Sequence, residues 1–396
     1  MKEFEEKKNR KEAEEKNKDF LFEMTEILNL QEKINEFKRR EFENFVKNLP
    51  DYTPRDLYDL LEKEGYRGQV EARKMVCVAI YRHIRRIKMI YEHKIPPNKL
   101  PEKINYIFMG PTGCGKTYII RLLFEKILKL PFVIIDITKY SETGYVGENV
   151  INIPYKLINA AKGNKYLAQI GAIIIDEFDK IAGASSNLRF AGAGTTKDVS
   201  GYGVQRELLK LLEHTKAEYG EDTHVTGVLN TENILFIAMG AFSGFSDKIY
   251  EKDIGFLKEV SEKGHPIAYK LKDEEEEDIF RFCKYGFLPE LIARFQRIIP
   301  FEPLDRKTLK EILDVKLEKI IKEFEFEGFK IKISEKAKDF IAYKALEKGV
   351  GARGIESVLM KELEKLSFEI FGKGKKGVIE IKEENNTIKT KIKFLK

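Results

Sequence analysis

A glycine-rich run over residues 110–117 has the residue types of a phosphate-binding loop. It reads Gly-Pro-Thr-Gly-Cys-Gly-Lys-Thr, follows the apolar residues 104–109 and precedes a helical pattern over residues 118–128. This is the strand–loop–helix setting that such a loop requires. Glycines let backbone N–H groups turn inward around phosphate oxygens, while Lys116 reaches the β- and γ-phosphates and the Thr117 hydroxyl ligates Mg²⁺. The residues expected to contact the nucleotide are Gly110, Pro111, Thr112, Gly113, Cys114, Gly115, Lys116, Thr117 and Tyr118.

Two carboxylates follow a second apolar segment, residues 172–175. The carboxyl end of a buried parallel strand meets the ligand crevice of an α/β sheet. An acidic pair after a strand is also typical of a helix N-cap, but beside a phosphate loop it predicts hydrolysis. We expect Asp176 to hold Mg²⁺, directly or through water, and Glu177 to orient and polarise the attacking water. Glu177 thus separates an ATPase from a passive nucleotide-binding module.

These residues need a sheet to position them, and the chain has the pattern of one. Between residues 54 and about 300, helical stretches alternate with nearly continuous apolar runs. Such runs are typical of strands buried on both faces of a parallel sheet. The expected strands cover residues 104–109, 132–135, 172–175 and 234–239. The sequence therefore predicts an α/β fold with helices flanking a parallel sheet.

The pattern changes after Pro300. Helical segments are expected over residues 306–323 and 334–372. Alternating runs over residues 377–382 and 387–394 predict a hairpin. We expect three regions: a charged helical extension (residues 1–50), a large ATPase domain (residues 51–300) and a small α+β C-terminal domain (residues 301–396).

The N-terminal extension leaves two interpretations open. Ile27, Leu30, Ile34 and Phe37 lie on one helical stripe with a spacing of seven. Two heptads are fewer than a coiled coil needs, so the helix either packs on its own domain or binds a partner. Residues 51–54, Asp-Tyr-Thr-Pro, break the pattern and mark a boundary.

Composition argues against several other classes of protein. The net charge is +6, from 71 basic and 65 acidic residues, without the concentrated basic stripe of a nucleic-acid partner. No apolar run reaches the ~18 residues of a membrane span, so no membrane partner is expected. The first 19 residues lack the apolar core of a signal peptide, so the cytoplasm is the expected location. The three cysteines form no C-x-x-C pair, so no zinc site is expected.

Taken together, the motifs of this chain resemble the ClpX family of AAA+ unfoldases, which partner the ClpP peptidase. The resemblance covers roughly residues 54–372. It is carried by residues 110–117, 144–148 (Gly-Tyr-Val-Gly-Glu), 176–180 (Asp-Glu-Phe-Asp-Lys), 198–201 and 203–205, 233–237 and 240–242, 286–295 and 351–354. It implies an AAA+ P-loop fold and ATP hydrolysis with Mg²⁺. It also implies a homo-hexamer that threads unfolded or tagged proteins through its pore to ClpP.

The resemblance also implies roles for single residues. Arg294 resembles the arginine finger, which reaches the nucleotide site of the neighbouring subunit. Arg353 resembles the second sensor, which reaches the phosphates from the small domain. Tyr145 and Val146, between glycines, resemble the loop that grips substrate in the pore, and residues 190–204 resemble a second pore loop. Ile254, Gly255 and Phe256 match the tripeptide that docks into ClpP.

The chain departs from the family at several places. No cysteine precedes Cys77, so we expect the charged extension to stand in place of the family's zinc-binding N-terminal domain. The Arg-Lys-His pore-entrance loop has no counterpart between His214 and Glu232. Arg67 stands beside the expected adenine position, and Met239 stands where a polar sensor is expected. Substrates and adaptors therefore stay open.

Three alternatives compete with this interpretation. A related HslU-type unfoldase carries a long insertion before the acidic strand, for which the interval here has no room, and lacks the Ile-Gly-Phe tripeptide. A remodelling chaperone would act without any peptidase. An AAA+ DNA motor is disfavoured by the aromatic pore loop and the modest charge.

Overall fold

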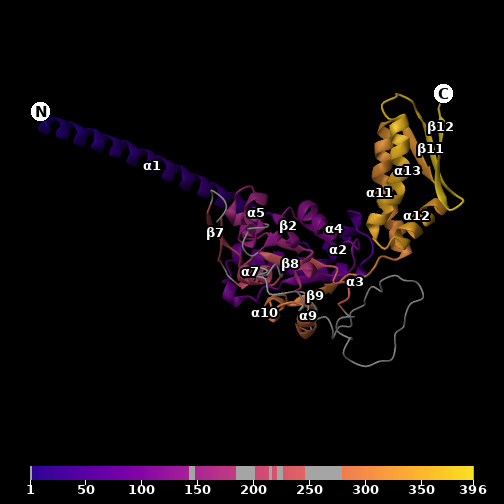
Figure 1. Cartoon of the computed structure of the whole chain (residues 1–396), viewed down its shortest axis with the longest axis horizontal. Coiled ribbons are helices and arrows are strands. Elements are labelled where there is room, and N and C mark those ends of the chain that lie inside the picture. The colour runs from indigo at the N-terminus through magenta and orange to yellow at the C-terminus, as the bar shows by residue number, and fades with distance from the viewer. Residues whose placement is uncertain are drawn as a thin grey trace, which may run out of the picture.

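A five-stranded parallel sheet forms the centre of the large domain. The computed structural model describes residues 2–141, 148–183, 201–213, 216–220, 226–245 and 279–395. The sheet has the order β2-β5-β8-β1-β9, and every neighbouring pair is parallel. Figure 1 shows this sheet between helices, with the smaller C-terminal domain beside it. The α/β fold expected from the sequence is therefore confirmed.

Along the described chain of the large domain, groups of one to three helices alternate with groups of one to three strands. Its helices are α1 (Lys2–Lys47), α2 (Pro54–Lys63), α3 (Val70–Tyr91), α4 (Lys116–Arg121), α5 (Ile153–Ala160), α6 (Lys165–Ala168), α7 (Gly201–Glu213), α9 (Ile279–Tyr285) and α10 (Pro289–Ile292). Its strands are β1 (Tyr106–Met109), β2 (Phe132–Asp136), β3 (Tyr140–Ser141), β4 (Glu148–Asn149), β5 (Ala172–Asp176), β6 (Lys216–Tyr219), β7 (Gly227–Asn230), β8 (Leu235–Gly240) and β9 (Arg297–Pro300). The four expected strands are all present, whereas the edge strand β9 and the short strands β3, β4, β6 and β7 outside the central sheet were not predicted.

Strand residues alternate between two hydrophobic cores, one on each face of the sheet. Ile107 and Ile173 belong to the core that α5 and α7 cover. Their neighbours Phe108 and Ile174 belong to the core that α3 and α4 cover. Because both faces are buried, both side-chain sets of each strand must be apolar, which explains the continuous apolar runs.

The small domain has a sheet and core of its own. Its elements are α11 (Arg306–Phe326), β10 (Phe329–Ile333), α12 (Glu335–Glu347), α13 (Ala352–Ile370), β11 (Gly377–Glu384) and β12 (Thr387–Phe394). The strands have the order β10-β11-β12, with β11 and β12 antiparallel. Asn385 and Asn386 form their two-residue turn with φ of 55° and 56°, as a type I′ turn requires. The expected hairpin is confirmed.

Two expectations for this domain need correction. The single helical segment expected over residues 334–372 is two helices, α12 and α13. Gly349 and Gly351 have φ of +66° and +58°, a backbone conformation that ends one helix before the next begins. The strand β10 was not predicted, although its residues Phe-Lys-Ile-Lys-Ile alternate as a half-buried strand does.

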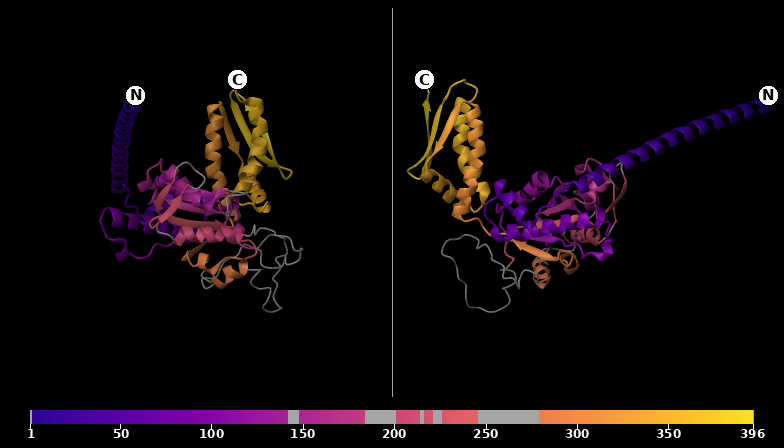
Figure 2. Two further views of the ribbon diagram at one scale, coloured as in Figure 1. Left: turned by 60° about the vertical axis from the view of Figure 1, so that its left-hand side comes forward. Right: turned by 180° about the vertical axis from the view of Figure 1, so that it is seen from behind.

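The N-terminal extension is one long helix, α1, of which the last part packs on the large domain. Phe42, Val46 and the following Leu49 are buried in the core with α3. The preceding part of α1 runs away from the domain in every view (Figures 1 and 2). Among the described residues, no helix is long and apolar enough to cross a membrane.

Candidate nucleotide site

The phosphate loop joins the end of β1 to the start of α4. Its backbone turns back at Gly113 and Gly115, where φ is +77° and +105°, values that favour glycine. Lys116 is buried within the loop, and its Nζ donates hydrogen bonds to the carbonyls of Gly110 (2.5 Å) and Pro111 (3.1 Å). These contacts hold the Lys116 ammonium group inside the predicted phosphate-binding loop.

The two carboxylates lie at the carboxyl end of β5, and β8 separates this strand from β1, which leads into the phosphate loop. Asp176 Oδ1 accepts a hydrogen bond from the backbone N–H of Glu177 (2.9 Å). Glu177 has φ 56° and ψ 30°, a left-handed conformation that costs a non-glycine residue of the order of 1 kcal/mol or more. The chain therefore bends sharply after the strand, and the Glu177 side chain is exposed while its neighbour Phe178 is buried.

A cavity of about 760 Å³ lies between the two domains and brings these groups together. This volume is in the range of nucleotide-sized ligand sites. From the large domain the cavity is lined by Gly65, Tyr66, Arg67, residues 112–118, Arg121, Asp176, Glu177, Gly240 and Ala241. From the small domain it is lined by Leu304, Ile312, Val315, Lys316, Lys319, Ile320, Ala352, Arg353, Glu356 and Met360.

The two domains meet backbone to backbone at the phosphate loop. The N–H of Ala352, the first residue of α13, donates a hydrogen bond to the carbonyl of Gly113 (3.1 Å). A Cβ added to Gly113 would lie 2.2 Å from the carbonyl oxygen of Val350, and one added to Gly351 would lie 2.5 Å from the carbonyl oxygen of Gly113. The start of α13, which carries Arg353, therefore lies directly against the loop.

The segment before α3 forms the other wall of the cavity. Tyr66 is buried, stacks on Tyr118 with a centroid separation of 6.0 Å, and donates a hydrogen bond to the carbonyl of Gly115 (3.4 Å). Burial raises the pKa of the Tyr66 hydroxyl well above its usual value, so it is a neutral donor. Arg67 lines the cavity, and its guanidinium donates hydrogen bonds to the carbonyls of Glu62 (2.6 Å) and Tyr66 (3.1 Å).

One residue of this segment ties three parts of the site together, and the sequence reasoning missed it. Gln69 Nε2 donates hydrogen bonds to the carbonyls of Cys114 (3.3 Å) in the loop and Glu302 (2.5 Å) in the connection to the small domain. Its Oε1 accepts from the N–H of Glu302 (2.9 Å). The two bonds to Glu302 span 233 residues of sequence, so no local pattern could have revealed them.

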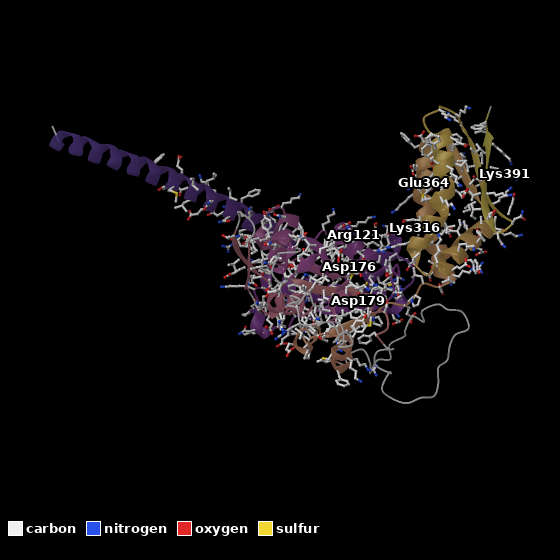
Figure 3. The ribbon with its side chains drawn as sticks, in the orientation of Figure 1. Arg121, Asp176, Asp179, Lys316, Glu364 and Lys391 are labelled. Carbon is white, nitrogen blue, oxygen red and sulfur yellow. The ribbon has the colours of Figure 1, made fainter. Side chains whose placement is uncertain are left out.

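Several cations of the cavity were also missed. Arg121 comes from α4, and Lys316 and Lys319 come from α11. Figure 3 shows Lys316 of the small domain on the side that faces Arg121 and Asp176 of the large domain. The sequence around Lys316 does not indicate a role in this site, because the residue reaches the cavity only where the two domains approach each other. An anion in the cavity would meet positive charge from both domains.

The two arginines expected in the site, Arg353 and Arg294, lie in different places. Arg353 lines the cavity, whereas Arg294 does not, and the Arg294 side chain is 45% exposed and paired with Glu213 at the end of α7. Burial raises the pKa of the Cys114 thiol, which disfavours a reactive thiolate. Met239 is fully buried in the core that α3 and α4 cover.

Other expected site residues lie outside the described residues. They are Tyr145 and Val146 of the first pore loop, residues 190–200 of the second, and Ile254, Gly255 and Phe256 of the docking tripeptide. Their roles remain predictions. The zinc expectation also stays a prediction, although the described residues contain no group of three or more His, Cys, Asp or Glu arranged to hold a metal.

Comparison with known proteins agrees with the fold. The model of the AAA domain (Cdc48 subfamily) matches residues 101–298, and the model of the C-terminal, D2-small domain, of ClpB protein matches residues 304–380. The fold and site thus define an AAA ATPase, which binds ATP with Mg²⁺.

Curated relatives then give the family. The chain is 37% identical to the ATP-dependent Clp protease ATP-binding subunit ClpX of Treponema denticola, over 87% of this chain and 84% of that protein. It is also 37% identical to the proteins of that name from Borrelia duttonii and Borrelia recurrentis, over 82% of this chain and 75% of each relative. The chain belongs to the ClpX family.

The side chains present fit ATP and Mg²⁺. Mg²⁺ is commonly held by one or two carboxylates together with substrate phosphates, and Asp176, Glu177 and the Thr117 hydroxyl line the cavity together. The buried ammonium of Lys116 supplies the positive charge that phosphates need. This donor set suits a hard cation and an anionic ligand.

The contact at Gly113 can be tested by substitution. We expect Gly113→Ala to weaken nucleotide binding and reduce ATPase activity by about tenfold or more, because its Cβ would collide with the Val350 carbonyl, at a cost of the order of 1–3 kcal/mol. Nucleotide affinity is measured with a fluorescent ATP analogue. Gly349→Ala is the matched control, since it has a similar φ of +66° but no atom within 4 Å of the added Cβ. If both substitutions lower nucleotide affinity equally, backbone strain and not the contact between the domains causes the loss.

Proposed function

We propose that this chain is an ATP-driven protein unfoldase, which assembles into a hexameric ring and delivers substrates through its pore to the ClpP peptidase. The observation that carries the proposal is the cavity lined by the catalytic carboxylates of one domain and by Arg353 of the other. Because the phosphate loop also contacts the start of α13, a change at the phosphates acts on the position of the small domain. Such a site converts hydrolysis into domain movement.

Each residue of the site has a separate task in this proposal. Lys116 would hold the β- and γ-phosphates, and Thr117 and Asp176 would hold Mg²⁺, which would neutralise charge as the phosphoryl group is transferred to water. Glu177 orients the attacking water and accepts its proton. Its strained backbone fixes the carboxylate at the edge of the cavity, in the way that strain is often found at functional sites. Arg353 binds the phosphates from the small domain.

The position of Arg294 fits action on a neighbouring subunit. Its carbonyl accepts a hydrogen bond from Asn105 Nδ2 (2.9 Å), and Asn105 directly precedes β1. The phosphate loop follows the opposite end of this strand, and a four-residue strand is about 13 Å long. Arg294 therefore lies near one end of β1, whereas the phosphate loop of the same chain lies at the other end. An exposed arginine there is available to the site of another chain in a ring.

The names of the relatives support the peptidase partner. The proteins from Treponema denticola and Borrelia duttonii are called ATP-binding subunits of the Clp protease. The tripeptide Ile254-Gly255-Phe256 is the feature of this chain that we propose for docking to ClpP. Tyr145 and Val146 would grip the substrate chain, because an aromatic and an aliphatic surface holds polypeptide without reading its sequence.

Glu177→Gln tests the hydrolysis assignment. The variant should bind ATP normally and lose turnover by ~10²–10⁴, as expected for removal of a general base. Equilibrium binding and phosphate release are measured on the same preparation. Glu347→Gln, in a surface ion pair of α12 with Lys344, is the control and should hydrolyse ATP at the parent rate. Turnover above about a tenth of the parent rate in the Glu177 variant would mean another residue positions the water.

Arg294→Ala tests the ring. We expect assembled rings of this variant to bind ATP and hydrolyse it far more slowly, since an arginine finger contributes of the order of 10³–10⁵ in rate. Mixing its subunits with Glu177→Gln subunits should restore part of the activity, because some interfaces then combine an intact Glu177 with an intact Arg294. Glu213→Gln removes the partner of Arg294 but keeps the guanidinium, and should stay active. A fully active monomer would rule out action between subunits.

Phe256→Ala distinguishes a protease component from an independent chaperone. Burying Ile and Phe side chains is worth roughly 1.5–3 kcal/mol each, and several loops of one ring act together through effective concentration. The variant should lose ClpP binding and degradation while ATPase activity and unfolding of a test protein persist. Phe326→Ala, at a 91% exposed position of α11, is the control. If the parent chain never binds ClpP but still unfolds protein, it acts alone or with another peptidase.

A further inference from the structure

The C-terminal part of α1 is built into the large domain. Phe42 is buried and makes a T-shaped contact with the Tyr91 ring at a centroid separation of 4.9 Å. Lys38 Nζ donates a hydrogen bond to the carbonyl of Gly163 (2.8 Å), and Asn164 Nδ2 donates to the carbonyl of Lys38 (2.9 Å). Asn164 is itself 2% exposed, so these bonds lie in a packed contact. The direction in which α1 leaves the domain is therefore fixed.

An apolar stripe begins where these contacts end. We call Ile27, Leu30, Ile34 and Phe37 the α1 stripe; their exposed fractions are 50%, 59%, 43% and 69%. They lie on one side of the helix, and this part of α1 projects away from the domain in both views of Figure 2. Four large apolar side chains in one row on a fixed helix are costly to leave in water. The row is long enough to meet one other helix.

The residue types of the α1 stripe favour a second copy of the same helix. In heptad terms Ile27 and Ile34 occupy the first apolar position, and Leu30 and Phe37 occupy the second. In parallel coiled coils, β-branched residues at the first position with Leu at the second favour a pair of helices over larger bundles. The first two turns of this pattern fit that rule, and Phe37 extends the row toward the anchored end.

The charge of α1 also favours a second copy over other partners. Residues 2–47 contain 12 basic and 13 acidic residues, so a helix of this composition meets itself without net repulsion. Binding to anionic membranes or to nucleic acid would require an excess of Lys and Arg, which this helix does not have. Intrahelical pairs such as Arg39–Glu43 (3.2 Å) and Arg40–Glu36 (3.7 Å) balance part of the charge already.

We propose that the α1 stripe is a self-association surface, which pairs in parallel with the α1 stripe of a second copy of this chain. Two heptads give a weak contact between free chains. In an assembly that holds both helices on the same face, the effective concentration makes such a contact persistent. The pairing goes beyond the proposed unfoldase activity, and its persistence rests on the proposed assembly.

Disulfide trapping in the full-length chain tests the pairing. Leu30→Cys and Asn29→Cys are compared under mild oxidation, each in a Cys283→Ser background, because Cys77 and Cys114 are buried. In a parallel pair the two copies of position 30 face each other, so thiols introduced by Leu30→Cys lie within disulfide distance. Position 29 lies on another side of the helix, so its two copies stay apart. We expect most of the Leu30→Cys chain to form covalent dimer and the Asn29→Cys chain to stay at background. Equal cross-linking of the two variants, or no dimer from Leu30→Cys, overturns the proposal.

A second comparison uses charge instead of cross-linking. Leu30→Glu should weaken self-association several-fold in sedimentation velocity, whereas Asn29→Glu, which adds the same charge one residue away, should leave it unchanged. Circular dichroism checks that α1 stays helical in both variants. Unchanged association of Leu30→Glu overturns the proposal. So does cosedimentation of the parent chain with vesicles of anionic lipid through the same leucine, which would assign the α1 stripe to a membrane instead.

Discussion

The backbone contact between the phosphate loop and the start of α13 is the constraint on which the rest of this structure depends. A carbonyl at Gly113 accepts from the N–H of Ala352 at 3.1 Å, so neither domain can move far without disturbing the other. The phosphate-loop pattern leaves position 113 free to be any residue. Here it must be glycine, because any Cβ would meet the Val350 carbonyl at 2.2 Å. A residue that looks optional for phosphate binding is thus required for domain contact.

Much of the site could be predicted from the sequence because its signals are local. The phosphate loop and the acidic pair each lie within a few residues of a buried strand, and the apolar run identifies that strand. Parallel pairing then brings the carboxyl ends of β1 and β5 to one edge, with β8 between them. Asp176 and Lys116 therefore line one cavity although sixty residues separate them.

The remaining features depend on contacts between distant segments, and no local pattern encodes these. Gln69 joins the loop to Glu302 across 233 residues, and Lys316 faces the site from α11 only because the domains approach each other. The break between α12 and α13 had a visible signal in Gly349 and Gly351. It was missed because the apolar spacing continues on both sides, and helical periodicity alone does not detect a change of axis. For α1, composition left packing and partner binding open; the structure shows that one end packs on the domain, while partner binding by the exposed stripe is a proposal.

Two helices from different domains begin at the same cavity, which bears on how nucleotide state is transmitted. α4 starts at Lys116, within the phosphate loop, and α13 starts at Ala352, against Gly113. The N-terminus of a helix carries a partial positive charge, which favours anions. A γ-phosphate between them would be attracted by both ends and by Arg353, and its loss would remove the charge that holds the two domains together. By linkage, any force that separates the small domain from the loop must lower nucleotide affinity by the same free energy. The angle between the two domains and the occupancy of the nucleotide site are therefore coupled through the hydrogen bond at Gly113.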